Sequence, residues 1–256
     1  MIYSIFRTHK VIALIAIISF LFFIFAFFIA RKEVIFADGA GYFSYPYELL
    51  LKGNLNYSSN SAQNYFGVIK TEYYNYNKYP IGTGIFLIPA YLVGEVTNRV
   101  VGVNDHSIYN KNYQFFVGVF GIFYLVIGLI TLKKILREFF KEKTIKLTLV
   151  LIVFATNLIV YSTTDASFSH IYSFVAVNFL LLSIINLRKR LSFKNLAVNG
   201  LALGLVLLIR PANVIAISLY LLIFLDKNFE FLKIKDVLNI TTKRLKQVTT
   251  ICIFTL

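Results

Sequence analysis

Charged residues are scarce in this sequence. Asp, Glu, Lys and Arg make up only 15% of the 256 residues, hydrophobic residues make up 58%, and the mean hydropathy is +0.71. Soluble domains contain about 25% charged and about 45–50% apolar residues. The scarcity of charge therefore excludes an ordinary soluble domain and indicates an integral membrane protein.

Cysteine is equally rare, because Cys252 is the single one. It cannot form an internal disulfide, so the cysteine count indicates no compartment. No internal repeat of fixed period is evident, which leaves solenoids and repeat-built transporters without support. No cluster of His, Cys and carboxylates has a usable spacing either, so we expect no structural metal and no cofactor.

Acidic residues are few relative to basic ones, 12 against 26, which gives a net charge of +14. In a soluble protein this excess would suggest a nucleic-acid partner. In a membrane protein, however, Lys and Arg collect in cytoplasmic loops. The distribution of the charge along the chain distinguishes these two explanations.

The first apolar segment, residues 11–30, is uninterrupted and is bounded by Lys10 and Arg31. Its length matches the roughly 20 residues that cross a bilayer, and exceeds the h-region of a cleaved signal peptide. We therefore expect an uncleaved spanning helix. The further apolar segments are 82–96, 113–132, 147–161, 171–187, 196–209, 212–225 and one that starts near 248.

The short segment 82–96, with Pro89 in its middle, decides the topology. If it does not cross, the N-terminus and loops 133–146, 188–195 and 226–247 share one side and hold 18 of the 26 Lys and Arg. The other side then has seven basic and six acidic residues, which is the positive-inside pattern. We therefore predict that 82–96 lies at the outer interface or re-enters the membrane. Topology explains the basic charge, and nucleic acid is not expected as a partner.

These segments predict an all-α polytopic membrane protein that forms a single transmembrane domain over residues 1–256. Residues 31–112 form a long outer loop, in which 42–52 is predicted to be a short amphipathic helix and 57–77 a loop. Residues 113–256 hold the remaining spans. The last one has only about nine residues, far fewer than a span needs, which predicts a truncated span or a fragment of a longer protein.

Two candidate site residues lie in the outer loop. Asp38 follows the first span and is flanked by Gly39 and Gly41, which would allow a tight turn beside a ligand. The alternative for Asp38 is a helix cap, which is equally consistent with the sequence. Lys78 precedes the interfacial segment, where it would pair with a phosphate or simply extend to the lipid headgroups.

Three more candidates lie at the outer ends of later spans. Asp165 is the only charge in a tight loop, and His170 stands at the start of the next helix; capping of the loop is the alternative for Asp165. Arg210, before Pro211, would hold a phosphate through its guanidinium or only anchor a turn. Tyrosines, Tyr79 among them, surround these positions and suit both a membrane interface and the face of a sugar.

The order of these motifs resembles the N-terminal half of the GT-C glycosyltransferases, family 39-like, the class of the bacterial aminoarabinose transferases and protein O-mannosyltransferases. The resemblance covers nearly the whole chain and is carried by short motifs: Asp38-Gly-Ala-Gly-Tyr42, Glu48 to Leu55, Lys78-Tyr-Pro80-Ile-Gly82, Leu-Val-Gly94, Lys133-Lys134, Thr-Thr-Asp165 and Gly204 to Arg210-Pro211. It implies a GT-C-like bundle of about seven transmembrane helices, with short juxtamembrane helices in the long first outer loop.

The resemblance also implies roles. Asp38 corresponds to the catalytic carboxylate, Lys78 to the lysine that binds the phosphate of a polyprenyl-linked donor, and Asp165 to a second catalytic-site acid that supports the acceptor or the site. The chain departs from the family at Gly39, where many members have a second acid, and it lacks the C-terminal spans and soluble domain. The resemblance therefore implies activity for a complete family member, and an inactive fragment is the alternative for this chain alone.

The resulting hypothesis is an inverting transfer of a sugar from a polyprenyl-phosphate donor to a lipid, glycan or protein acceptor. Asp38 would act as general base, and Lys78 and Arg210 would stabilise the leaving phosphate. The site would face outward from the cytoplasmic (inner) membrane of a bacterium, in contact with membrane lipids. The alternatives are a lipid-linked polysaccharide polymerase and a lipid or solute transporter, although a transporter should carry its charges near the bilayer midplane.

Overall fold

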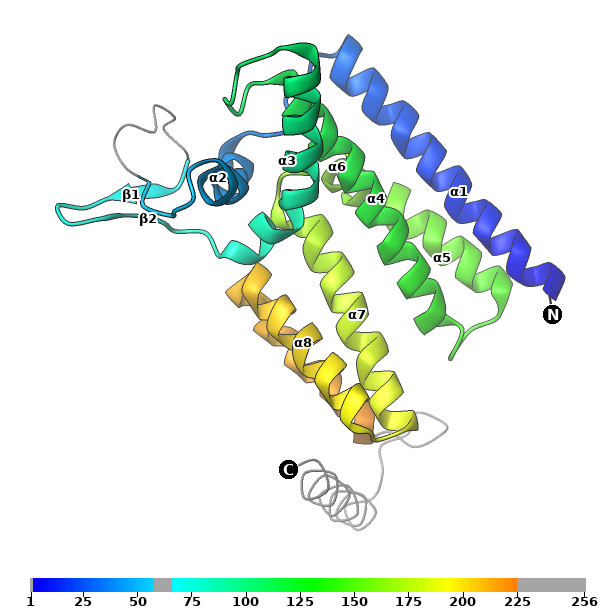
Figure 1. Cartoon of the computed structure of the whole chain (residues 1–256). Coiled ribbons are helices and arrows are strands. Elements are labelled where there is room, and N and C mark those ends of the chain that lie inside the picture. The colour runs from blue at the N-terminus through cyan, green and yellow to red at the C-terminus, as the bar shows by residue number, and fades with distance from the viewer. Residues whose placement is uncertain (1, 58–65, 225–256) are drawn as a thin grey trace.

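The computed structural model describes residues 2–57 and 66–224, most of which are helical (Figure 1). The longer helices are α1 (Ile2–Ile24), α2 (Ala37–Leu51), α3 (Ile81–Val101), α4 (Lys111–Leu136), α5 (Glu142–Phe154), α7 (Ser169–Lys189) and α8 (Phe193–Ile209). The shorter or irregular elements are the π-helix η1 (Phe25–Ile29), strands β1 (Val68–Lys70) and β2 (Asn75–Asn77), helix α6 (Leu158–Tyr161) and the 3₁₀ helix η2 (Pro211–Phe224).

Four helices of the described chain are long and apolar enough to cross a membrane. They are His9–Ile29, Ile81–Val101, Lys111–Leu136 and Ser169–Lys189. Two shorter apolar helices, Phe193–Ile209 and Pro211–Leu221, accompany them. The described chain is thus mostly helical with the features of a membrane protein, which agrees with the predicted class, while the number of about seven spans stays a prediction.

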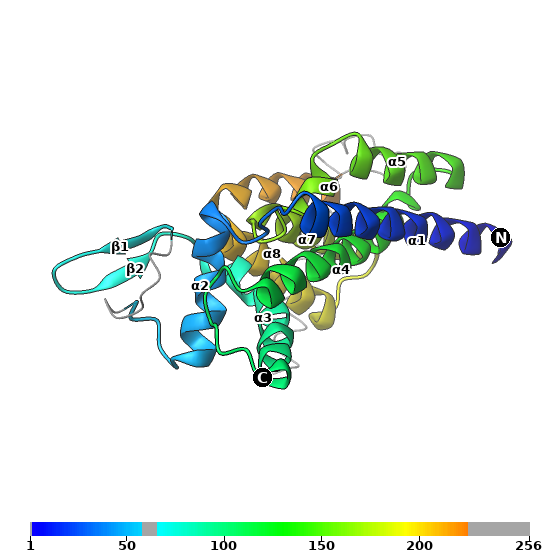
Figure 2. The same ribbon diagram turned by 90° about the horizontal axis from the view of Figure 1, so that it is seen from above.

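The helices differ in direction. In Figure 1, α1, α4, α5, α7 and α8 have roughly aligned axes, and α7 packs against both α4 and α8. Helix α3 stands at a steep angle to this set, which is also clear in the view from above in Figure 2. Helix α3 nevertheless packs along α4 and α2, and so lies between the aligned helices and the polar part of the chain.

Glycine allows α3 to begin in close contact with α8. A Cβ on Gly82 would lie 2.5 Å from the backbone carbonyl carbon and oxygen of Leu208 and 2.6 Å from the nitrogen of Ile209. No side chain fits into this space. The start of α3 is therefore held against the end of α8, although the two are far apart in the sequence.

The end of α1 and the start of α4 also lie together. Gln114, in the first turn of α4, accepts hydrogen bonds at Oε1 from the backbone N–H groups of Val34 (2.6 Å) and Ile35 (2.8 Å). Its Nε2 donates to the carbonyls of Ile35 and Ile108. The chain that leaves α1 therefore returns, after α2, the hairpin and α3, to the same end of the aligned helices.

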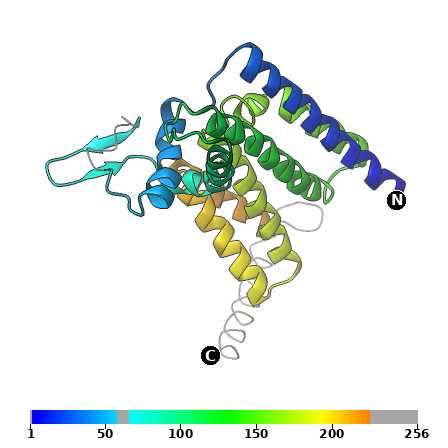
Figure 3. The same cartoon turned by 45° about the horizontal axis from the view of Figure 1, so that its top comes forward.

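Several predicted segments differ from the structure. Segment 82–96 is part of the 21-residue helix α3, which is long enough to cross a membrane, and segment 212–225 is the 3₁₀ helix η2. Segment 147–161 is two helices, α5 and α6, because Thr156 Oγ1 donates to the carbonyl of Ile152 and accepts from the N–H of Leu158, which competes with the helical bonds there. Segment 57–77, predicted as loop, contains the antiparallel hairpin β1–β2, which projects away from the helices in Figure 3. The last predicted span, from about 248, lies outside the described residues.

Candidate functional site

Asp38 lies in the first turn of α2. Its side chain does not cap the helix and is hydrogen-bonded to another segment of the chain. The N-cap position is Phe36, and no side chain caps this helix. Asp38 Oδ1 instead accepts a hydrogen bond of 2.6 Å from the hydroxyl of Tyr79. The alternative interpretation of Asp38 as a capping residue is therefore wrong, and its half-buried carboxylate is directed at a distant segment of the chain.

The two glycines beside Asp38 have a different role from the predicted turn. Both are helical, and both allow another segment to approach α2 closely. A Cβ on Gly39 would lie 1.8 Å from Ser167 Oγ, and one on Gly41 would lie 2.5 Å from the Tyr79 ring. The absence of these side chains brings the turn at 162–168 and the chain before α3 against the face of α2 that carries Asp38.

Tyr79 contacts three residues of the predicted motifs: Asp38, Tyr42 and Lys78. Its ring lies 4.8 Å, between centroids, from the ring of Tyr42 on α2. The Nζ of Lys78 lies 5.0 Å from the Tyr79 ring centroid and 5.1 Å from that of Phe66, at cation–π distances. Lys78 is otherwise exposed, so its ammonium stays accessible to an anion from solvent or the membrane surface.

His170 and Arg210 form the other side of the cluster. His170 is at the start of α7, and Arg210 directly follows α8, and Arg210 Nη1 lies 3.4 Å from His170 Nδ1. The His170 ring stacks on Tyr161 at 3.9 Å. The charges of Arg210, Asp165 and Asp38 all act on this ring, so the predicted residues from three separate segments are brought together.

Asp165 lies in the turn between α6 and α7, as predicted. Its Oδ1 accepts a hydrogen bond of 3.0 Å from Thr164 Oγ1, and its backbone N–H and C=O form turn bonds to Val160 and Phe168. The backbone of Asp165 therefore helps to hold this turn, which agrees with the alternative prediction that Asp165 organises the loop. Its half-buried carboxylate still contributes negative charge at His170.

The tyrosines of the cluster remain protonated hydrogen-bond donors. Burial raises the pKa of the Tyr79 phenol, and the hydrogen bond and the negative charge of Asp38 raise it further. Burial also raises the pKa of Tyr42, against the lowering effects of a Ser169 hydrogen bond and the Arg210 charge, while Asp38 adds to the increase. The tyrosine hydroxyls therefore act as donors toward the Asp38 carboxylate and the rest of the site.

Sequence reasoning missed four residues that build this cluster. Ser167 and Ser169 contact α2, Tyr161 supports His170, and Asn77 fixes Tyr79 by accepting from its N–H at 3.0 Å. Ser167 also donates to the carbonyl of Val34 at 2.6 Å. Small and aromatic residues in a polar turn carry no signal that distinguishes such contacts from ordinary turn composition.

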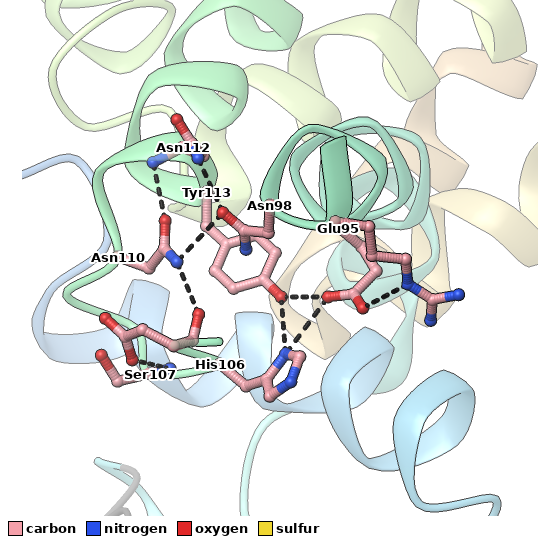
Figure 4. Close-up of polar contacts among 9 residues, drawn as sticks. Glu95, Asn98, His106, Ser107, Asn110, Asn112 and Tyr113 are labelled. Carbon is pink, nitrogen blue, oxygen red and sulfur yellow. Dashed lines mark hydrogen bonds and ion pairs between the residues drawn. The ribbon is translucent and has the colours of Figure 1, made fainter. Parts of the chain in front are cut away.

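A second polar cluster lies where α3 ends and α4 begins (Figure 4). The buried Glu95 carboxylate accepts from the Tyr113 hydroxyl at 2.6 Å and from Arg99 Nε at 3.0 Å, and His106 Nδ1 lies 3.2 Å from it. Asn98 Oδ1 accepts from the Nδ2 atoms of Asn110 and Asn112 at 3.2 and 2.7 Å. These bonds fasten the 102–110 loop and fix how α3 meets α4, which makes this cluster structural.

The Asp38 cluster consists of Asp38, Tyr42, Lys78, Tyr79, Asp165, His170 and Arg210. It contains no group of side chains that could hold a metal ion, and it is separate from a cavity where α1 and α4 meet. Within residues 2–57 and 66–224 there is no group of three or more His, Cys, Asp or Glu side chains that could hold a metal ion. A cavity of about 450 Å³ lies instead at the junction of α1 and α4, and none of its lining residues belongs to the Asp38 cluster.

Comparisons with known proteins add no relative. No family model, no curated protein and no solved structure matches this chain. The interpretation of the site therefore depends on its geometry and on the motifs in the sequence.

Proposed function

We propose that this protein is a membrane-embedded glycosyltransferase that transfers a sugar from a polyprenyl-phosphate donor. The observation that supports the proposal is the Asp38 cluster. Asp38 is a half-buried carboxylate near the end of an apolar helix, and among the described residues only its Oδ1 accepts a hydrogen bond. A carboxylate held by one oxygen leaves the other oxygen to take a proton from an acceptor.

In the proposed reaction, Asp38 Oδ2 removes the proton from an acceptor hydroxyl or amine. The acceptor atom attacks the anomeric carbon of the donor, and the bond from this carbon to the phosphate oxygen breaks with inversion. The electron pair leaves with the polyprenyl phosphate. Lys78 and Arg210 supply positive charge to that leaving group, and Tyr79 keeps Asp38 oriented.

The position of α3 is consistent with the site being at a membrane surface. The Gln114 bonds join the start of α4 to the residues that follow α1, so the two helices have adjacent ends. If α1 and α4 both cross the membrane, residues 31–112 begin and end on one side, and α3 does not complete a crossing. We propose that this is the outer side, from the positive-inside distribution of Lys and Arg.

The arrangement of charges favours this function over transport. A transporter is expected to hold its charged residues near the bilayer midplane, on interrupted helices. Here Asp38, His170 and Arg210 lie at helix ends. A lipid-linked polysaccharide polymerase would use the same kind of donor, and only the identity of the acceptor separates it from the proposed transferase.

The test is transfer of radiolabelled sugar from a polyprenyl-phosphate donor by membranes that contain the full protein. Asp38→Asn is expected to lower transfer at least about a hundredfold, within the usual contribution of a general base. Donor binding, measured by photo-crosslinking, should persist in Asp38→Asn and weaken in Lys78→Gln. Glu72→Gln, in the exposed hairpin turn, is the charge-matched control. Transfer by Asp38→Asn at the control's rate would remove Asp38 as the base.

A further inference from the structure

The cavity at the junction of α1 and α4 combines apolar and cationic walls. Its volume is about 450 Å³, and it is lined by residues from the end of α1, the chain after it, the 102–110 loop and the start of α4: Phe27, Phe28, Arg31, Lys32, Glu33, Tyr109, Lys111 and Gln114. Three of these residues are cationic and one is acidic. The cavity therefore suits an anion more than a neutral or cationic group.

The apolar wall is at the level where the span ends. The apolar part of α1 runs to Ile29. Phe27 and Phe28 belong to its last turn, with ring centroids 5.7 and 6.1 Å from that of Phe115 on α4. Phe28 is 61% exposed, so its ring would face lipid chains. Arg31 and Lys32 follow the span directly, which places them at the depth of the headgroup phosphates.

The backbone around Arg31 adds an independent observation. The last turn of α1 is the π-helix η1, and the N–H of Lys32 closes the helix end by donating to the carbonyl of Ala26 at 3.0 Å. This closure puts Arg31 at φ +52°, in the left-handed region that a helix end usually gives to glycine or asparagine. A non-glycine residue there is strained, and such strain is often found at functional positions.

The floor of the cavity is rigid. Gln114 is only 4% exposed, and its amide holds the backbone of Val34, Ile35 and Ile108 through four hydrogen bonds. These bonds fix the chain that carries Arg31 and Lys32 against the first turn of α4, which carries Lys111. The cations are thus held around one space by a buried amide, whereas lysines that only extend to the headgroups need no such support.

We propose that this cavity binds the phosphate headgroup of an anionic membrane lipid. The cations Arg31, Lys32 and Lys111 would contact the phosphate, and Phe27 and Phe28 would contact the first part of the acyl chains. This site is separate from the Asp38 cluster and does not depend on the proposed sugar transfer. It would anchor the junction of α1 and α4 to the surface of an anionic membrane.

The test is lipid binding to the full chain in detergent, measured by native mass spectrometry with dioleoylphosphatidylglycerol, and with dioleoylphosphatidylcholine for comparison. The triple variant Arg31→Gln, Lys32→Gln, Lys111→Gln removes the three cations. Since each basic residue near an anionic surface contributes about fivefold in binding, we expect at least a tenfold loss of phosphatidylglycerol binding. The control variant Lys134→Gln, Lys141→Gln, Lys143→Gln removes the same charge from exposed positions outside the cavity, and because these lysines do not line the cavity we expect a clearly smaller loss than in the first triple variant.

Arg31→Gly separates binding from folding. Glycine accepts the positive φ, so the melting temperature should be unchanged or higher, while phosphatidylglycerol binding falls about fivefold.

Equal binding by the triple variant and the original protein would overturn the proposal, as would an equal loss in the control variant. Displacement of the lipid by an equal concentration of inorganic phosphate would show a free-phosphate site and overturn it too. Unchanged binding in Arg31→Gly would remove Arg31 from the site.

Discussion

The hydroxyl of Tyr79 donates a 2.6 Å hydrogen bond to Oδ1 of Asp38, and this bond joins the first turn of α2 to the chain just before α3. In the sequence, Asp38 precedes the tyrosine-rich hairpin and Tyr79 follows it. Their contact means that a change at either one alters both the orientation of the carboxylate and the position of α3.

Tyr79→Phe is expected to separate these effects. The variant keeps the ring against Tyr42 but loses the hydrogen bond to a charged acceptor, which typically contributes about 1.5–3 kcal/mol. We expect sugar transfer to fall at least about tenfold, because Asp38 loses its fixed orientation. Transfer assays and thermal unfolding in detergent measure the two effects. Full transfer activity in Tyr79→Phe would exclude a positioning role.

Gly39→Ala is expected to be among the most destabilising alanine substitutions in α2. Its Cβ would lie 1.8 Å from Ser167 Oγ and 2.6 Å from Ser167 Cβ, so α2 must move away from the 162–168 turn. Overpacking of this kind costs about 1–3 kcal/mol. Gly200→Ala in α8, with no atom within 4 Å of the added Cβ, is the matched control and should be neutral or stabilising by up to about 1 kcal/mol. Equal melting temperatures for the two variants would contradict this account.

Glu48 on α2 should make the protein less stable as the pH rises. It is 0% exposed, neither carboxylate oxygen has a hydrogen-bond partner among the described residues, and Lys52 Nζ is 3.5 Å away. Burial raises the pKa of Glu48 above its ordinary value of 4.5, and Lys52 offsets this only in part. Between these two pKa values the folded protein binds more protons than the unfolded one, so its stability falls as the pH rises through that window.

Glu48→Gln should therefore flatten the pH dependence of the melting temperature above the ordinary Glu pKa of 4.5. Glu72→Gln, an exposed acid in the hairpin turn, should leave the slope of the original protein. A slope in Glu48→Gln equal to that of the original protein would show that another group produces it.

Cysteine labelling tests whether α3 crosses the membrane. In a Cys252→Ser background, we expect Asp105→Cys and Asn54→Cys to react with an impermeant maleimide from the same side, and Lys143→Cys from the opposite side. This result follows if the adjacent ends of α1 and α4 share a membrane surface. Reaction of Asp105→Cys from the side opposite to Asn54→Cys would place α3 across the membrane and put the 102–110 loop on the other side from the start of α2.

The long helices were predictable because their apolar runs are long and bounded by charge. Segments 113–132 and 171–187 correspond to helices that reach two to four residues beyond the predicted limits. Segment 11–30 corresponds to a helix that begins at Ile2 and ends, as η1, at Ile29. The break at Thr156 was not predictable from hydropathy, because it results from a side-chain hydroxyl that competes with backbone bonds inside an apolar run. The hairpin was missed because its strands have only three residues each and few apolar side chains.

The charged candidates could be chosen from the sequence, but the contacts between them could not. Charge at the ends of apolar segments identified Asp38, Lys78, Asp165, His170 and Arg210. The sequence could not indicate that Tyr79 would bond to Asp38, or that Gly39 would face Ser167, since both depend on how distant segments pack. The cavity at the end of α1 was missed for the same reason, because Lys111 approaches Arg31 only once Gln114 has joined α4 to the chain after α1.

Because Gly82 at the start of α3 packs against the backbone of Leu208 in α8, this contact can form during synthesis only after α8 has been made. Helix α3 leaves the ribosome long before α8, and at about 5–20 residues per second the delay is on the order of 10 s. During that time the Gly82 face of α3 is uncovered, and Asp38 and Tyr79 are present without His170 and Arg210. The Asp38 cluster is therefore assembled only after α8 has been inserted, which gives membrane insertion factors and chaperones a defined interval in which to act on the incomplete chain.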